Sequence, residues 1–278
     1  MTAAEQGGAS VLGMDEATVR RREYVKKFLE EHIYPNERLF GGLEHNDPEA
    51  EAKMKELQQI TKKDGYWAPH LVAEAGGMGI GFLPYAYMNE VIGRSAYAPR
   101  AFGSQAPDSG NAEILHQYGS AELQERFLKP LVNGDVRSCF SMTEPDVSGA
   151  DPTGLETTAV RDGDEWVING RKWFFSGARG AAFAIVMCVT EPDAPPHSRM
   201  SQIVVPTDTP GFNIEKQVEV WGDKDATPPD LTMATRASRS ATSWANPAAA
   251  SSSPSDDLVP GASTTACAPS ARPSAPST

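Results

Sequence analysis

The chain has 278 residues, 40% of them hydrophobic, which is enough for about two domains with buried cores. Its formal net charge of -12 argues against a nucleic-acid or anionic-membrane partner, because both would repel it. The N-terminal stretch lacks the features of a signal peptide, and no apolar run approaches the ~20 residues of a membrane span, so we expect a cytoplasmic protein.

Residues 1–136 are predicted to form an all-α domain. In "EYVKKFLEEHI", residues 23–33, apolar side chains recur every three or four positions and share one face of a helix. The segment "PEAEAKMKELQQITKKDG", residues 48–65, repeats this pattern. Three more helices are expected at residues 82–95, 109–119 and 119–135. Ser120 is the candidate N-cap of the last one.

Residues 137–222 have a different period and predict a small β domain. "EWVINGRKWFF" is apolar on both sides of Asn169-Gly170, a dipeptide typical of hairpins, and Asp162-Gly163 marks a second turn. "AAFAIVMCVT" and "SQIVVPT" indicate continuous buried strands. Helices followed by strands, without βαβ alternation, predict an α+β chain of several domains.

Residues 223–278 are predicted to lack stable structure. From Leu231 onward the chain consists mainly of Ala, Ser, Pro and Thr, without an apolar period. Such a composition is typical of disordered segments, because it offers too little apolar surface to bury.

Most motifs outside the β domain carry little functional signal. "GGMGIG", residues 76–81, lacks the preceding strand that a dinucleotide-binding loop needs, which favours a loop between helices. The five histidines and three cysteines share no ligand spacing, so no metal site is expected. No G-x-S-x-G nucleophile motif is present.

The stretch "CFSMTEPDVSGAD", residues 139–151, is the candidate site. Ser141 and Thr143 lie at a predicted strand end, where hydroxyls and free backbone N–H groups can donate to a planar heterocycle at ~1 kcal/mol each. Aromatic side chains in "KWFF", residues 172–175, could cover the face of such a ring. The alternative is a polar turn beside a hydrophobic hairpin, and the pattern alone leaves both open.

Several motifs together resemble the acyl-CoA dehydrogenase family. They are "CFSMTEPDVSGAD", "WVINGRKWFFSGA" and "TDTPGFNI" in the β domain, with "GYWAPHLVAEAGGMGIGFLPYAYMNEVIGRS" and "APDSGNAEILHQYGSAELQERFLKPLVNGD" in the helical one. The resemblance runs from about Tyr24 to Gly222. It implies an N-terminal helical domain, a small β-barrel-like middle domain and a C-terminal four-helix bundle. The bundle is not recognisable in this sequence.

The resemblance also implies FAD as cofactor, bordered by the stretch 140–151. The residues it places at the flavin are Phe140, Met142, Thr143, Gly149, Phe174 and Ser176. Thr143 and the backbone at Met142 are expected at the pyrimidine edge, Phe174 over the ring and Ser176 near N5. Ala150 stands where the family usually has a serine, so a polar contact to the cofactor or the acyl-CoA substrate is expected to be lost.

Family members of this kind oxidise an acyl-CoA to its trans-2-enoyl-CoA in fatty acid metabolism. A carboxylate removes the α-proton while the β-hydride passes to the flavin. That glutamate lies in the bundle, so no catalytic residue is assigned here, and the position of Glu144 before Pro145 suggests a structural role. The polypeptide as written is therefore expected to be inactive, to hold FAD weakly or not at all, and to aggregate through uncovered apolar faces.

Two other functional classes remain open from the sequence. One is an acyl-CoA oxidase on the same scaffold, and the other is a non-catalytic fragment that binds flavin or a partner. For full-length relatives the resemblance implies electron-transfer flavoprotein as the electron acceptor and a homo-oligomer, either a dimer or a tetramer.

A slipped reading frame after about Trp221 is the preferred explanation of the tail, over a genuine disordered extension. Read in a shifted frame from Ala237 onward, the codons of the tail can encode a sequence that resembles the last strand and next helix of the family. We therefore expect resequencing of the coding DNA around codon 222 to reveal a frame slip. An intact frame, together with turnover by the purified chain, would contradict this hypothesis.

Overall fold

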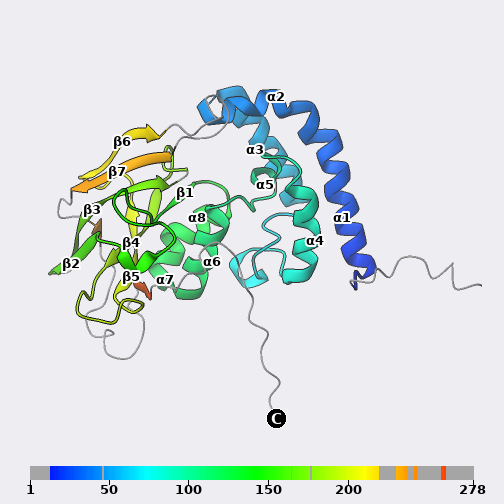
Figure 1. Cartoon of the computed structure of the whole chain (residues 1–278). Coiled ribbons are helices and arrows are strands. Elements are labelled where there is room, and N and C mark those ends of the chain that lie inside the picture. Colours follow the sequence, from blue (N-terminus) through cyan, green and yellow to red (C-terminus); the bar gives the residue numbers. More distant parts are fainter. Residues whose placement is uncertain are drawn as a thin grey trace, which may run out of the picture. The chain divides into compact units, whose positions relative to one another are not determined.

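The computed structural model of the chain describes residues 13–45, 47–163, 165–175, 177–218, 230–236, 241–242 and 258–260. Contacts divide the chain into two compact units, residues 1–105 and 106–278 (Figure 1). Within the described ranges, no helix is long and apolar enough to cross a bilayer.

The first unit is helical, as the sequence predicts. It contains α1 (Glu16–Phe28), a π-helical turn (Leu29–Ile33), α2 (Glu37–Phe40), α3 (Pro48–Lys63), α4 (Phe82–Ile92) and α5 (Ala98–Ala101). Short 3-10 turns lie at Tyr34–Asn36, Gly41–His45 and Ala73–Ala75. Asp15 and Asp47 cap α1 and α3, because their carboxylates accept hydrogen bonds from N–H groups of the first turn. The glycine-rich segment 76–81 connects a 3-10 turn to α4.

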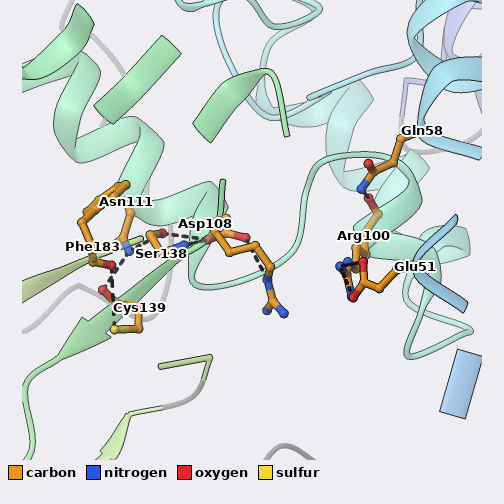
Figure 2. A network of polar contacts seen from close by, with 9 residues as sticks. Glu51, Gln58, Arg100, Asp108, Asn111, Ser138, Cys139 and Phe183 are labelled. Carbon is orange, nitrogen blue, oxygen red and sulfur yellow. Dashed lines mark hydrogen bonds and ion pairs between the residues drawn. The ribbon is translucent and has the colours of Figure 1, made fainter. Parts of the chain in front are cut away.

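One hydrophobic core holds the first unit together. Its fully buried members include Val25, Leu29, Ile33, Met54, Leu57, Met88, Ile92 and Phe102. α5 is tied to α3 by polar contacts as well: Arg100 donates two hydrogen bonds to Glu51, and Gln58 donates to the Arg100 carbonyl (Figure 2). The apolar faces predicted for the segments 23–33 and 48–65 are thus the ones that are buried.

The second unit begins with helices and continues as a sheet. The helices are α6 (Asp108–Tyr118), α7 (Ala121–Leu123), a π-helical turn (Gln124–Leu128) and α8 (Lys129–Val132). Ser120 caps α7, since its Oγ accepts a hydrogen bond from Leu123 N at 3.1 Å. Contacts group these helices with the sheet, whereas the sequence places a domain boundary at residue 136, which stays a prediction.

The strands form one mixed sheet in the order β6-β7-β3-β2-β4-β5-β9, with β1 paired to β4 and β8 to β3. Their bounds are β1 (Ser138–Ser141), β2 (Thr158–Asp162), β3 (Glu165–Phe175), β4 (Phe183–Val189), β5 (Met200–Pro206), β6 (Phe212–Val218), β7 (Asp230–Arg236), β8 (Ala241–Thr242) and β9 (Leu258–Pro260). β1 and β2 run parallel to β4, and the other pairs are antiparallel.

The hairpin expected at Asn169-Gly170 is wrong. The chain turns at Asp162-Gly163 instead, and Asn169 and Gly170 lie in the middle of β3, opposite Thr158 of β2 and residues of β7. Gly170 serves packing rather than a turn, because a Cβ at this position would lie 2.2 Å from Thr157 Oγ1. Long-range pairing thus overrides the local turn signal.

The sheet continues past residue 222, where the sequence predicts the end of the β domain. β7 lies between β3 and β6 and pairs with both. Pairing of this kind uses main-chain groups, and neighbouring strands that would otherwise be open edges can recruit a segment whatever its composition. The rest of the predicted tail, residues 223–278, lies mostly outside the described residues, so its disorder and the frame hypothesis stay predictions.

Candidate cofactor site

The candidate site lies where β1 leaves the sheet. Cys139 faces the core of the sheet, whereas Phe140 and Met142 pack on the other face in a second hydrophobic cluster. The other members of that cluster are Leu155, Met187, Val189 and Met200. Of the two hydroxyls expected at the strand end, that of Ser141 is fully buried, and that of half-buried Thr143 donates to the Trp173 carbonyl.

The start of β1 is fixed by polar side chains of α6. Asp108 Oδ1 accepts hydrogen bonds from both N and Oγ of Ser138, each at 2.7 Å. Asn111 Nδ2 donates to Ser138 Oγ at 2.8 Å and to the Cys139 carbonyl at 3.2 Å. Figure 2 shows these side chains converging on the first residues of the strand. β1 therefore enters the site in a set position.

The end of β1 is held by β3. The N–H of Trp173 donates to the Thr143 carbonyl at 3.0 Å, and the Thr143 hydroxyl donates to the Trp173 carbonyl. These two bonds tie Thr143, at the start of the polar turn (residues 143–151), to the strand β3, which carries the aromatic side chains. The pairing of β3 with β7 is irregular between Lys172 and Phe175, so β3 bulges at this point.

Phe174 lies in the bulge with an unusual backbone and an exposed ring. Its φ is 50°, in the left-handed region that L-residues other than glycine rarely adopt, at a cost of order 1–3 kcal/mol. The residue is 39% exposed, and its ring contacts that of Trp173 edge-on at 4.7 Å between centroids. Strain that presents a large apolar ring to solvent leads to the hypothesis that Phe174 contacts a ligand.

A buried ion pair lies beneath this surface. Lys172 is 0% exposed and Glu144 only 4%. Lys172 Nζ lies 2.7 Å from Glu144 Oε1 and 2.8 Å from the Met142 carbonyl oxygen. The carboxylate of Glu144 also accepts hydrogen bonds from the N–H groups of Glu156 and Thr157, at 2.7 and 2.9 Å. Both charges are therefore compensated inside the protein.

The environment keeps Glu144 ionised. Burial by itself raises the pKa of Glu144, but the Lys172 ammonium and the donors of Thr157 and Glu156 outweigh it, so the pKa lies below its ordinary value. Burial lowers the pKa of Lys172, and the adjacent carboxylate limits that shift. A carboxylate engaged in this way is a poor proton acceptor, which agrees with the structural role expected for Glu144.

The turn after Glu144 folds back over Thr143. A Cβ on Gly149 would lie 3.2 Å from Thr143 Cγ2, so the glycine allows this close approach. Ala150 is exposed and contributes no polar group. Asp151 Oδ1 accepts hydrogen bonds from N and Oγ1 of Thr153, at 3.0 and 2.6 Å, and so closes the turn.

The structure brings part of the predicted set together. Thr143 is bonded to the neighbour of Phe174 and lies against Gly149. Phe140 and Met142 turn their side chains into the second hydrophobic cluster, which leaves their backbone as the part that could meet a cofactor. Ser176 lies outside the described residues. The cofactor roles of all these residues stay predictions.

Lys172 is the residue that sequence reasoning overlooked. Trp166 and Ile168 of β3 point inward, and the same alternation places Lys172 inside. A lysine at an inward position of a strand is a signal, since a buried ammonium needs a partner. The identity of the partner could not be read from β3 itself.

Comparison with known proteins gives matches over both units. Residues 15–135 match the family model of the acyl-CoA dehydrogenase N-terminal domain, and residues 139–234 match that of the acyl-CoA dehydrogenase middle domain. A relative from Mycobacterium tuberculosis, named as the acyl-CoA dehydrogenase FadE2, is 39% identical over 222 residues. That alignment covers 76% of this chain and 53% of the relative.

Solved structures agree with these matches. An acyl-CoA dehydrogenase structure from Mycobacterium abscessus is 34% identical, with a TM-score of 0.76 over 89% of this chain and 61% of that one. A glutaryl-CoA dehydrogenase from Mycobacterium smegmatis, solved in complex with FADH2, shares the fold at 23% identity and a TM-score of 0.66, over 90% of this chain and 57% of that one. The chain spans about half of FadE2 and about a quarter of other curated relatives.

We expect the buried carboxylate of Glu144 to make the fold sensitive to acid. Because its pKa is lower in the folded state, its stabilisation is complete above the ordinary value of 4.5 and is lost as pH falls through the folded-state pKa. Glu144→Gln should cost ~3–5 kcal/mol at neutral pH, since it leaves the Lys172 ammonium unpaired.

Urea unfolding of both proteins, followed from neutral pH down into this acidic range, checks the prediction. The difference in unfolding free energy between wild type and Glu144→Gln should narrow on acidification. A difference that stays constant with pH would contradict the assignment.

Proposed function

Because the chain belongs to the acyl-CoA dehydrogenase family, whose members are flavoprotein oxidoreductases of fatty acid metabolism, we propose that it supplies the FAD-contacting part of an acyl-CoA dehydrogenase. The reaction is the α,β-dehydrogenation of an acyl-CoA thioester to the trans-2-enoyl-CoA. The observation that carries the proposal is the exposed ring of Phe174, presented by a strained backbone, beside the hydrogen bonds between Thr143 and Trp173.

The residues at this junction fit a planar ring with hydrogen-bond acceptors along one edge. Among the described residues, none accepts a hydrogen bond from the N–H of Thr143, so this donor is available to a ligand. Phe174 offers an apolar face of the size that an aromatic heterocycle stacks on, worth ~0.5–1.5 kcal/mol beyond area burial. The buried ammonium of Lys172 donates to the Met142 carbonyl, which belongs to the same peptide group as the Thr143 N–H. Its positive charge strengthens that N–H as a donor to an electron-rich acceptor.

Each residue has a distinct part in this proposal. Thr143 and the Met142 backbone orient the pyrimidine edge, Phe174 covers the ring and Gly149 lets the turn approach closely. Ser176 and Phe140 remain as further predicted contacts, and Ala150 lines the substrate side without a polar group. When bound, FAD would supply the acceptor for the hydride that leaves the β-carbon.

The α-proton requires a base that the described site does not offer. A base must lie within hydrogen-bond reach of the proton it takes, and Glu144 is buried and saturated with donors. We therefore propose that the 278-residue polypeptide by itself holds FAD weakly and does not turn over. In the complete enzyme a carboxylate from elsewhere would act as the base, electron-transfer flavoprotein would accept the electrons, and subunits would form a homo-oligomer.

An acyl-CoA oxidase and a non-catalytic flavin- or partner-binding fragment are the competing functions. The oxidase would pass electrons to oxygen, and the fragment would bind without chemistry.

Anaerobic addition of acyl-CoA to the FAD-loaded polypeptide tests the proposed lack of turnover. We expect no bleaching of the flavin absorbance, because the described residues of the site offer no base. Bleaching would contradict the proposed inactivity and place a base within the chain. Peroxide formed in air would in addition favour the oxidase.

The variant Phe174→Gly tests whether the Phe174 ring contributes to FAD binding rather than to the stability of the fold. Glycine accepts a φ of 50° without strain, so the free energy of unfolding should stay within about 1 kcal/mol of wild type. FAD affinity should fall about tenfold with the loss of the ring, as measured by quenching of flavin fluorescence.

A matched control is Val160→Ala, which shortens another exposed apolar side chain on β2, 61% exposed. Val160→Ala should leave both the free energy of unfolding and the FAD affinity unchanged. Wild-type FAD affinity in Phe174→Gly would remove Phe174 from the proposed site.

A further inference from the structure

The buried ion pair lies at a point where three segments meet. Lys172 belongs to β3, Glu144 to the polar turn, and the donors Glu156 and Thr157 to the approach to β2. Burying an ammonium completely is costly, because its water of hydration is lost and only its new partners offset that loss. Replacing such a pair by apolar side chains often leaves stability unchanged. Stability alone is thus a weak reason for it.

The second acceptor of Lys172 suggests a use for the pair. Lys172 Nζ donates to the carbonyl of Met142 at 2.8 Å. This carbonyl and the N–H of Thr143 belong to one peptide group. A cation at the carbonyl oxygen draws electron density toward it and makes the N–H at the other end of the group a stronger donor. That N–H has no acceptor among the described residues.

Lys172 also fixes the direction in which this donor points. The Met142 carbonyl is held by Lys172, and the Thr143 carbonyl by Trp173 N–H at 3.0 Å. Two successive carbonyls anchored to β3 leave the intervening N–H little freedom to rotate. Glu144 in turn holds the ammonium, through a contact of 2.7 Å.

We propose that Lys172, held in place by Glu144, is a positioning residue that orients and polarises the Met142–Thr143 peptide toward the acceptor edge of the flavin. This inference rests on the proposed function, since the flavin is the ligand invoked. It adds a role for two buried residues that do not touch the ligand themselves.

The test compares Lys172→Met, Glu144→Gln and the double variant in the full chain. Methionine keeps much of the length of lysine without its charge. Each single variant leaves one buried charge unpaired and should lower the free energy of unfolding. The double variant removes both charges and should recover much of that loss.

FAD affinity should behave differently from stability. It should fall about tenfold in Lys172→Met and stay low in the double variant, because the bond to the Met142 carbonyl is absent in both. If the pair were only structural, affinity would return together with stability in the double variant. That outcome would overturn the proposal.

Val205→Ala is the matched control for stability. Val205 is buried in β5, among the residues of the sheet core. Its truncation should lower the unfolding free energy without weakening FAD binding. A comparable loss of affinity in this control would show that binding follows global stability, and would also overturn the proposal.

Amide hydrogen exchange, measured without flavin, tests whether Lys172 orders the turn that carries the Met142–Thr143 peptide. In apo Lys172→Met, exchange should accelerate at the N–H groups of Trp173, Glu156 and Thr157, which bond to the turn, and remain slow in β4 and β5. Unchanged exchange at those three amides would refute the ordering role. Failure of the wild-type chain to bind FAD would refute the proposed function and the flavin part of the inference, while the exchange data still decide the ordering role.

Discussion

The ammonium of Lys172 is the contact on which the geometry of the site depends. It is buried in the second unit and joined to Glu144 and to the Met142 carbonyl. Removing it from water costs several kcal/mol, and only short contacts to a carboxylate and a carbonyl can offset that cost. These contacts hold together the end of β1, the bulge of β3 and the turn after Glu144.

β1 has four residues, yet both of its ends are held by polar contacts. Asp108 and Asn111 of α6 bind its first residues, and Lys172 and Trp173 of β3 bind the residues that follow its last one. The strand has little apolar area of its own, so these polar contacts set where the chain leaves the sheet. Such support from rigid elements is what a binding site needs to keep its donors in place.

The same region stores strain at Phe174. A left-handed backbone at a phenylalanine and an exposed ring are both unfavourable in the free protein. The bulge persists because the bonds on either side of it are satisfied. Glu144, whose carboxylate is paired with Lys172 in the same strand as Phe174, is fully engaged by its donors. The region is thus suited to binding and orienting a ring rather than to moving a proton.

The sequence by itself determined the helical first unit, the buried strands and the stretch that carries the candidate site. Apolar periodicity is a local property: the faces of residues 23–33 and 48–65 follow from side-chain spacing alone. The Ser120 cap was likewise predicted from local sequence. The motifs around residues 139–151 indicated the family, and the matched family models agree.

Only the tertiary structure decided what depends on distant partners. Asn169-Gly170 became the centre of a strand because β2, β7 and Thr157 lie against it, whatever its local turn preference. The partner of Lys172 is 28 residues away in sequence, and no periodicity links the two. Whether a polar group near a strand end is half-buried, as Thr143 is, or fully buried, as Ser141 and Glu144 are, is set by which elements pack around it. Burial and pairing are properties of the folded chain, and they convert an ambiguous polar turn into a defined site.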